Sequence, residues 1–179
     1  MEFLPNVVAS TLVWKQPKWS LDHFELKAGA QVLGELCWTK CLSDQAVARS
    51  GQSTWVLDRR GFFRDRLVAV EPGTEVVAAS FTFSWRKDGD LVLADGRSFR
   101  WYRTRLLDPA WALAIKAGGA VFEIHLGMNW LKREATVRLS PDVRAMPGLS
   151  LLLCLGMYLA LCTMQDEAGA VVAATAACG

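Results

Sequence analysis

The stretch that decides the fold is residues 149–164, LSLLLCLGMYLALCTM, near the C-terminal end of the 179-residue chain. Leucine, methionine and alanine favour a helix, and the run is too long for one ordinary strand. The segment is apolar on every side, as in a helix that is either deeply buried or inserted in a membrane. Because no charged residue lies between Arg144 and Asp166, its length alone is compatible with a membrane span.

Two features beside this segment favour burial. Pro147 and Gly148 shorten the usable helix to about 16–18 residues, near the lower limit for crossing a bilayer. No cluster of lysine or arginine follows the segment, as an anchored tail would be expected to show. Gly156 and Ala160 are four residues apart, so we expect a large inward side chain such as a tryptophan to pack against them.

The preceding part of the chain, from about residue 23 to residue 139, has the period of two that is typical of strands. Phe81, Phe83 and Trp85 are expected on one face of their strand, and Val32, Gly34, Leu36 and Trp38 on one face of another. Turn signals about every ten residues predict short antiparallel strands in an up-and-down arrangement. The turn signals are Ala28-Gly29, Ser50-Gly51, Pro72-Gly73, Asp88-Gly89, Asp95-Gly96 and Gly118-Gly119.

These two patterns together predict a closed antiparallel barrel around a helix. Ten to twelve strands close into a barrel that is too wide for side chains to fill, and the apolar helix is the one segment available to occupy it. We therefore expect a single, mostly β domain over residues 1–179, with a barrel of about twelve strands at about 9–140 and a central helix at about 148–165. The Ala-rich tail, 168–179, has a composition compatible with partial disorder. A membrane span at 149–164 stays open as an alternative.

Composition and charge place few limits on function. The net charge of +2 does not by itself indicate a nucleic-acid partner. Five scattered cysteines are typical of reduced thiols in the cytosol, and the N-terminus lacks the basic and apolar regions of a secretory signal. We therefore expect a cytoplasmic protein, with a peripheral membrane location as one possibility. The sequence leaves the oligomeric state open.

Several segments, in their order along the chain, resemble the tubby C-terminal domain superfamily. The nearer likeness is to the branch that holds the plant LURP-one-related proteins and the phospholipid scramblases. It covers roughly residues 9–166. The segments are 12–17 (LVWKQP), 24–26 (FEL), 32–36 (VLGEL), 59–63 (RRGFF) and 140–143 (SPDV) before the apolar helix.

The resemblance implies a twelve-stranded barrel around a central helix and a role with lipids at a membrane surface. Tubby domains bind phosphoinositide head groups, and scramblases are associated with calcium-dependent lipid movement. This chain departs from the scramblase pattern, because it lacks the proline-rich N-terminal region and the lipidated cysteine cluster. Only Asp142 remains of the acidic calcium segment, so the resemblance does not extend to calcium-triggered scrambling.

Arginine density is the clearest polar feature of the sequence. Arginine forks suit phosphate, and the neighbouring aromatic residues suit a membrane surface, so the two arginine-rich segments predict an anionic-lipid patch if they meet on one face. The alternative is that they are solvated strand faces, partly paired with Asp58, Asp65 and nearby acids. A nucleic-acid partner is not expected. The candidate residues are Arg59, Arg60, Arg64, Arg66, Arg97, Arg100, Arg103 and Arg105.

Catalytic and metal-binding patterns are weak, so we expect a non-enzymatic protein without a cofactor. Cys37 and Cys41 have a spacing allowed for half a zinc site, but no second pair with ligand spacing follows, so no metal is expected. His23 and His125 fall on the polar side of strand alternations and are read as surface residues. A barrel that binds a small ligand or hydrolyses a substrate in a pocket at one of these histidines is the alternative class of function.

Overall fold

The computed structural model describes residues 11–17, 22–39, 44–61, 64–84, 86–104, 109–116, 118–129 and 132–177. Within these ranges, twelve antiparallel strands follow one another around a closed barrel, and β1 pairs with β12 to close it. The strands are β1 Thr11–Lys15, β2 His23–Ala28, β3 Gln31–Trp38, β4 Gln45–Ser50, β5 Ser53–Arg60, β6 Arg66–Val70, β7 Val77–Phe83, β8 Gly89–Leu93, β9 Ser98–Arg103, β10 Ala110–Ile115, β11 Ala120–Asn129 and β12 Lys132–Leu139.

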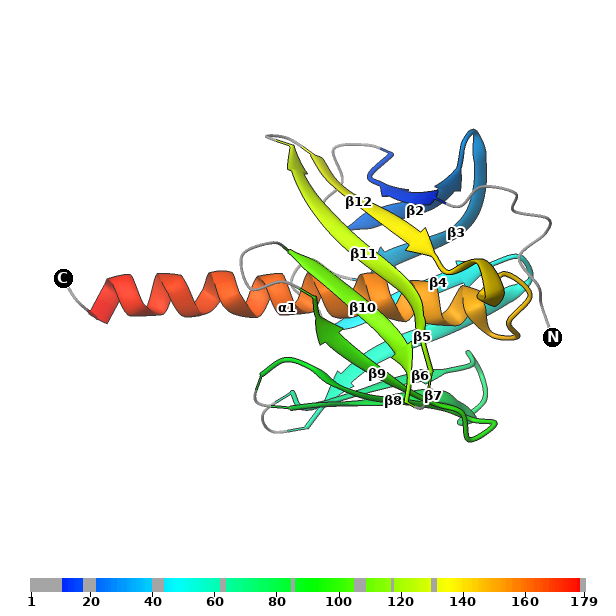
Figure 1. Cartoon of the computed structure of the whole chain (residues 1–179). Helices are drawn as coiled ribbons and strands as arrows, with labels where there is room; N and C mark the ends of the chain where they lie inside the picture. Colours follow the sequence, from blue (N-terminus) through cyan, green and yellow to red (C-terminus); the bar gives the residue numbers. More distant parts are fainter. Residues whose placement is uncertain are drawn as a thin grey trace.

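One helix, α1 (Leu149–Ala177), passes along the axis of the barrel (Figure 1). Its first part is the apolar stretch 149–164, and residues 151–163 are all buried. The predicted barrel with a central apolar helix is confirmed. The helix is longer than the predicted range of 148–165, because it continues past Asp166 and out of the barrel (Figure 1).

The helix is long and apolar enough to cross a membrane, but here it is the core of the barrel. The stretch Leu149–Ala168 has a mean hydropathy of 1.5, and 83% of its most apolar window is buried inside the structure. The inward side chains of the strands cover it, among them Trp14, Phe24, Trp101 and Trp111. In this arrangement most of the segment faces the inside of the barrel, and its exposed residues, Gln165, Glu167 and Ala168, lie at its C-terminal end.

Strand alternation decides which side chains reach this core, and one bulge changes it. On β2, Phe24 and Leu26 point inward, as predicted from the sequence. On β3, the pairing steps from Leu26–Gly34 to Lys27–Val32, so that Leu33 is an extra residue. The prediction that Val32 shares the inward face was therefore wrong: Val32 is 44% exposed, and Leu33 is buried in its place.

Two glycines are required by close approach. A Cβ on Gly156 of α1 would lie 2.8 Å from the ring of Phe122 and 3.1 Å from Ile124 Cδ1. The large side chain that packs there is thus a phenylalanine on β11, where a tryptophan was expected. A Cβ on Gly89 would overlap the carbonyl oxygen of Thr82, and the positive φ of the hairpin that precedes β8 falls on Lys87.

A short connection leads from the barrel into the helix. The 3-10 helix η1 (Pro141–Val143) follows β12, and Gly148 has a φ of +78° just before α1 begins. The guanidinium of Arg97, in the turn between β8 and β9, donates a hydrogen bond of 2.8 Å to the carbonyl oxygen of Pro147. The start of the helix is therefore tied to one end of the barrel.

Candidate functional site

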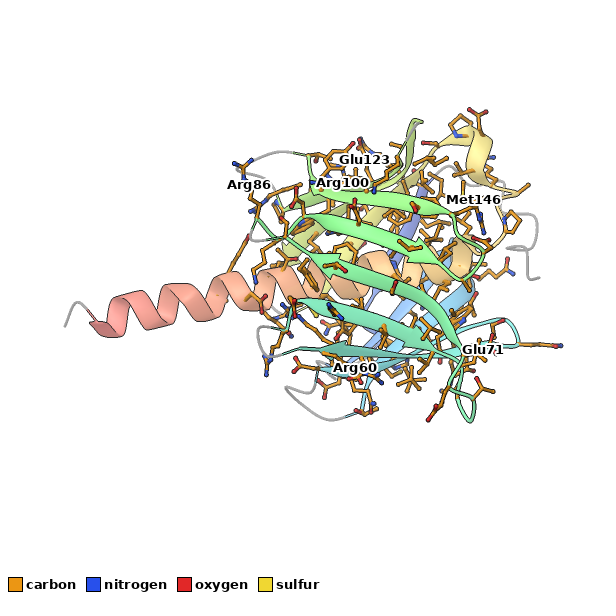
Figure 2. The ribbon with its side chains drawn as sticks, turned by 90° about the horizontal axis from the view of Figure 1, so that it is seen from below. Arg60, Glu71, Arg86, Arg100, Glu123 and Met146 are labelled. Carbon is orange, nitrogen blue, oxygen red and sulfur yellow. The ribbon has the colours of Figure 1, made fainter. Side chains whose placement is uncertain are left out.

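The strongest concentration of charged side chains lies at the other end of the barrel, where α1 leaves it. We call this end the exit rim. It is formed by the ends of β5, β7 and β9 and the starts of β6, β8 and β10, together with Asp166 and Glu167 of the helix. Figure 2 shows Arg86 at this end, and Glu71 and Met146 at the opposite end.

A buried arginine links the barrel wall to the helix at the exit rim. Arg59 occupies an inward position of β5, following Trp55 and Leu57, and its side chain is only 4% exposed. Its guanidinium donates two hydrogen bonds to the Asp166 carboxylate, of 3.2 Å and 2.8 Å. Its Nε donates a third, of 2.7 Å, to the carbonyl oxygen of Arg64, and the guanidinium lies 4.6 Å from the ring centre of Phe83. Each nitrogen of this guanidinium therefore donates a hydrogen bond.

Asp166 also forms an ion pair with a second cation, Lys87. Lys87 Nζ lies 2.6 Å from Asp166 Oδ2, and it reaches the carboxylate from the β7–β8 turn. Burial disfavours the charged form of Asp166, but the hydrogen bonds from Arg59 and Lys87 outweigh it, so the pKa of Asp166 is lowered. Burial of the guanidinium lowers the pKa of Arg59, but the hydrogen bond and charge of Asp166, together with contributions from Cys162 and Tyr158, outweigh it, so this pKa is raised. The helix thus carries a stable anion at this point of the rim.

The next residue of the helix makes a similar but more exposed contact. Arg103, at the end of β9, lies 2.9 Å from a carboxylate oxygen of Glu167, and its guanidinium is 5.5 Å from the ring centre of Trp111. The side chains of Arg103 and Glu167 are 35% and 44% exposed. Water therefore screens this pair much more than it screens Arg59 and Asp166.

A third contact joins the helix to the β3–β4 side of the rim. The Tyr158 hydroxyl donates a hydrogen bond to the backbone carbonyl of Asp44, and its ring stacks on Trp38 at 5.7 Å. The Asp44 carboxylate pairs with Arg64 at 3.1 Å. Three separate strands of the wall are therefore connected to α1 near its exit.

The arginines selected from the sequence do not form one face. Arg59 is inside the barrel and is unavailable to a lipid surface. Arg97 lies at the opposite end, near the start of the helix, and Arg105 lies outside the described residues. Arg100, on the outer face of β9, pairs with Asp88 and Asp90. The remaining four are at or near the exit rim: Arg60, Arg64, Arg66 and Arg103.

The cations at the exit rim are paired, but they are mostly the outer member of each pair. Arg60 is 59% exposed while its partner Asp58 is 26% exposed, and Arg64 is 58% exposed while Asp44 is 32% exposed. Lys87 is likewise more exposed than Asp166. In the Arg103–Glu167 pair the carboxylate is the more exposed member. In three of these four pairs the surface presented to solvent is therefore enriched in positive charge.

The remaining candidate features lie elsewhere. Cys154 and Cys162 are buried in the helix, and burial raises their pKa values to about 12 and about 11, as expected of core thiols. Cys41 lies outside the described residues. Burial, with a contribution from Glu35, raises the pKa of Cys37, so this thiol is not an activated nucleophile.

An open pocket of about 540 Å³ lies beside the β4–β5 turn and the β6–β7 connection. Its lining includes Arg49, Trp55 and Glu71 but neither His23 nor His125. His125 lies 3.5 Å from Glu123 on the outer wall. The pocket thus lacks the histidine that the hydrolytic alternative requires.

The barrel with an apolar helix through its centre is the tubby-like fold that the sequence led us to expect. Comparison with solved structures finds the X-ray structure of a protein from Arabidopsis thaliana, AT5G01750, with a TM-score of 0.51 and 15% sequence identity. The alignment covers 82% of this chain and 89% of that one. At this identity the likeness concerns the fold alone. No protein-family model matches the chain, and no curated protein matches it.

Proposed function

We propose that this protein is a non-enzymatic, peripheral membrane-binding domain whose exit rim faces anionic phospholipid. The observation that carries the proposal is the continuation of α1 beyond the rim. After Glu167 the helix runs to Ala177 without a charged residue, and it projects from the barrel (Figure 1). Ten residues of helix span about 15 Å, a depth suited to the head-group region and the outer part of the acyl chains.

The charge distribution around the projecting helix supports the same orientation. Arg60, Arg64 and Arg86 are exposed, and Figure 2 shows Arg86 at the end from which the helix emerges. A cation near an anionic membrane surface contributes about 1 kcal/mol. An apolar helix end surrounded by arginines therefore combines the two weak signals that stable peripheral binding requires.

Sedimentation with lipid vesicles tests this proposal. Wild type should sediment with vesicles of phosphatidylcholine containing phosphatidylserine or a phosphoinositide, and much less with phosphatidylcholine alone. Arg64→Glu with Arg86→Glu should bind about 30-fold more weakly or worse, since two cationic contributions of about 1 kcal/mol are lost. The matched control, Arg49→Glu with Lys116→Glu, changes the net charge equally but away from the rim.

The outcomes separate the possibilities. Equal loss of vesicle binding in both double variants would show that only the net charge matters. It would overturn the proposal that the exit rim faces the membrane. Absence of binding by wild type to every vesicle would overturn the lipid role itself. A preference for phosphoinositide over phosphatidylserine at equal charge would define the head group.

A further inference from the structure

A second group of chemically active side chains lies on the outer wall of the barrel, near the exit ends of β2 and β3. His23 begins β2 and pairs directly across from Cys37 on β3. Glu35 is two residues before Cys37, so that both side chains point to the same face of the strand. The imidazole nitrogen, the carboxylate oxygen and the thiol sulfur all lie within 4.8 Å of one another.

We propose that His23, Glu35 and Cys37 bind a zinc ion, with a fourth position left for water or an external ligand. Imidazole, carboxylate and thiolate are the ligands that zinc takes in proteins, at about 2.0–2.3 Å. A tetrahedron with such bonds has edges of about 3.3–3.8 Å. Because the three atoms lie at most 4.8 Å apart, they need to approach by no more than about 1.5 Å to reach these edges.

The state of His23 is a second, independent observation. Its Nε2 is shielded from solvent, yet it has no hydrogen-bond partner among the residues that the structure describes. A shielded polar atom without a partner costs free energy, and a bound ion is one of the usual reasons for it. A zinc ion bound through Nε2 would provide the partner that this nitrogen lacks.

The backbone holds the three side chains in a constant arrangement. The ladder pairs His23 with Cys37, Phe24 with Leu36 and Glu25 with Glu35. The Trp38 backbone N–H also donates a hydrogen bond of 2.8 Å to the Asp22 carbonyl, just beyond the ladder. Glu25 pairs with Lys27 at 2.7 Å, which leaves Glu35 as the carboxylate directed at the site.

This arrangement explains why spacing along the chain did not indicate the site. The spacing of residues 37 and 41 is allowed for half of a zinc motif, and no second half follows further along the sequence. The structure supplies the other donors from the neighbouring strand and from the same strand. Strand pairing, which the linear sequence does not display, brings His23 to Cys37. The site is independent of the proposed lipid role.

Cobalt substitution of the full-length, reduced and metal-free protein tests the inference. Cobalt(II) bound by Cys37 should give one equivalent of binding, a thiolate-to-cobalt charge-transfer band and intense tetrahedral d–d bands, all displaced by zinc. Cys37→Ser should remove the charge-transfer band. His23→Gln and Glu35→Gln should each weaken zinc binding by at least about 10–100-fold, because loss of a residue that only hydrogen-bonds to a metal ligand already has an effect of this size. Competition with a chromophoric chelator measures the zinc affinity.

His125→Gln is the matched control, because it removes the other histidine, which also lies beside a glutamate on the outer wall. It should bind zinc as wild type does. Circular dichroism checks that each variant is folded, and Glu35→Gln, which keeps the shape of the side chain, provides a readout if another variant unfolds. A band that persists in Cys37→Ser, wild-type affinity in His23→Gln or Glu35→Gln, or no metal binding by wild type would overturn the site.

Discussion

Asp166→Asn should destabilise the fold far more than its position near the surface suggests. The substitution keeps the shape of the side chain but removes the charge that faces Arg59 and Lys87. One partner, the guanidinium of Arg59, is almost completely buried. Removing one member of a buried ion pair costs about 3–5 kcal/mol, because the other charge stays buried without compensation. Asp166 is 22% exposed and asparagine keeps one acceptor, so we expect a loss of about 2–3 kcal/mol.

Urea unfolding at neutral pH, followed by tryptophan fluorescence, measures this loss. In a chain of this length, it corresponds to a fall in Tm of about 5–10 °C. Glu167→Gln is the matched control one residue further on, and it should cost less than about 1 kcal/mol, because its pair with Arg103 is exposed to water. Equal effects of the two substitutions would refute the reasoning, because it depends on the burial of Arg59, which Arg103 does not share.

Three further predictions concern the same helix. Gly156→Ala should destabilise by about 1 kcal/mol, since overpacking against Phe122 exceeds the gain in helix propensity, and in a Phe122→Leu background the sign should reverse in the same urea assay. Tyr158→Phe should cost about 1 kcal/mol in thermal unfolding through the lost hydrogen bond to the Asp44 carbonyl, and an unchanged Tm would show that this bond contributes nothing. The folded-state pKa of Asp166 is lowered, so its stabilisation is complete above the ordinary carboxyl pKa and is lost as pH falls through the folded value. The difference between wild type and Asp166→Asn should therefore be constant from about pH 7 to about pH 5 and shrink below about pH 4, and a constant difference down to pH 2 would contradict this.

The core of the fold was predictable because it follows from repeated patterns. Alternation in the strands and an apolar segment too long for a strand are properties of many residues at once, so single exceptions do not change the result. The bulge at Leu33 is such an exception. It turns Val32 outward without altering the barrel. Valine and leucine are both apolar, so the residue types do not indicate whether Val32 or Leu33 faces the core.

The exit rim was only partly predictable. Arginine density drew attention to residues 59–66, but the sequence did not indicate that Arg59 lies inside the barrel. Alternation from Trp55 and Leu57 places residue 59 on the inward face, and this was the available signal. A charged residue at an inward position normally indicates that the buried part of the strand has ended before it. Its partner, Asp166, is 107 residues away, and no local pattern connects them.

The polar contacts of α1 also account for its position in the barrel. A helix that is apolar on every side gains nearly the same burial in any rotation. A shift of one turn, about 5.4 Å, would exchange about four buried apolar residues at one end for about four at the other. Burial alone therefore does not define depth or rotation. Gly156 fits one place against Phe122, and Asp166 reaches the Arg59 guanidinium at one depth only. A one-turn shift inward would bury Asp166 away from Lys87, and a shift outward would leave Arg59 facing Cys162. The buried ion pair thus acts mainly as a register for the helix, and it sets how far the uncharged end of α1 projects from the rim.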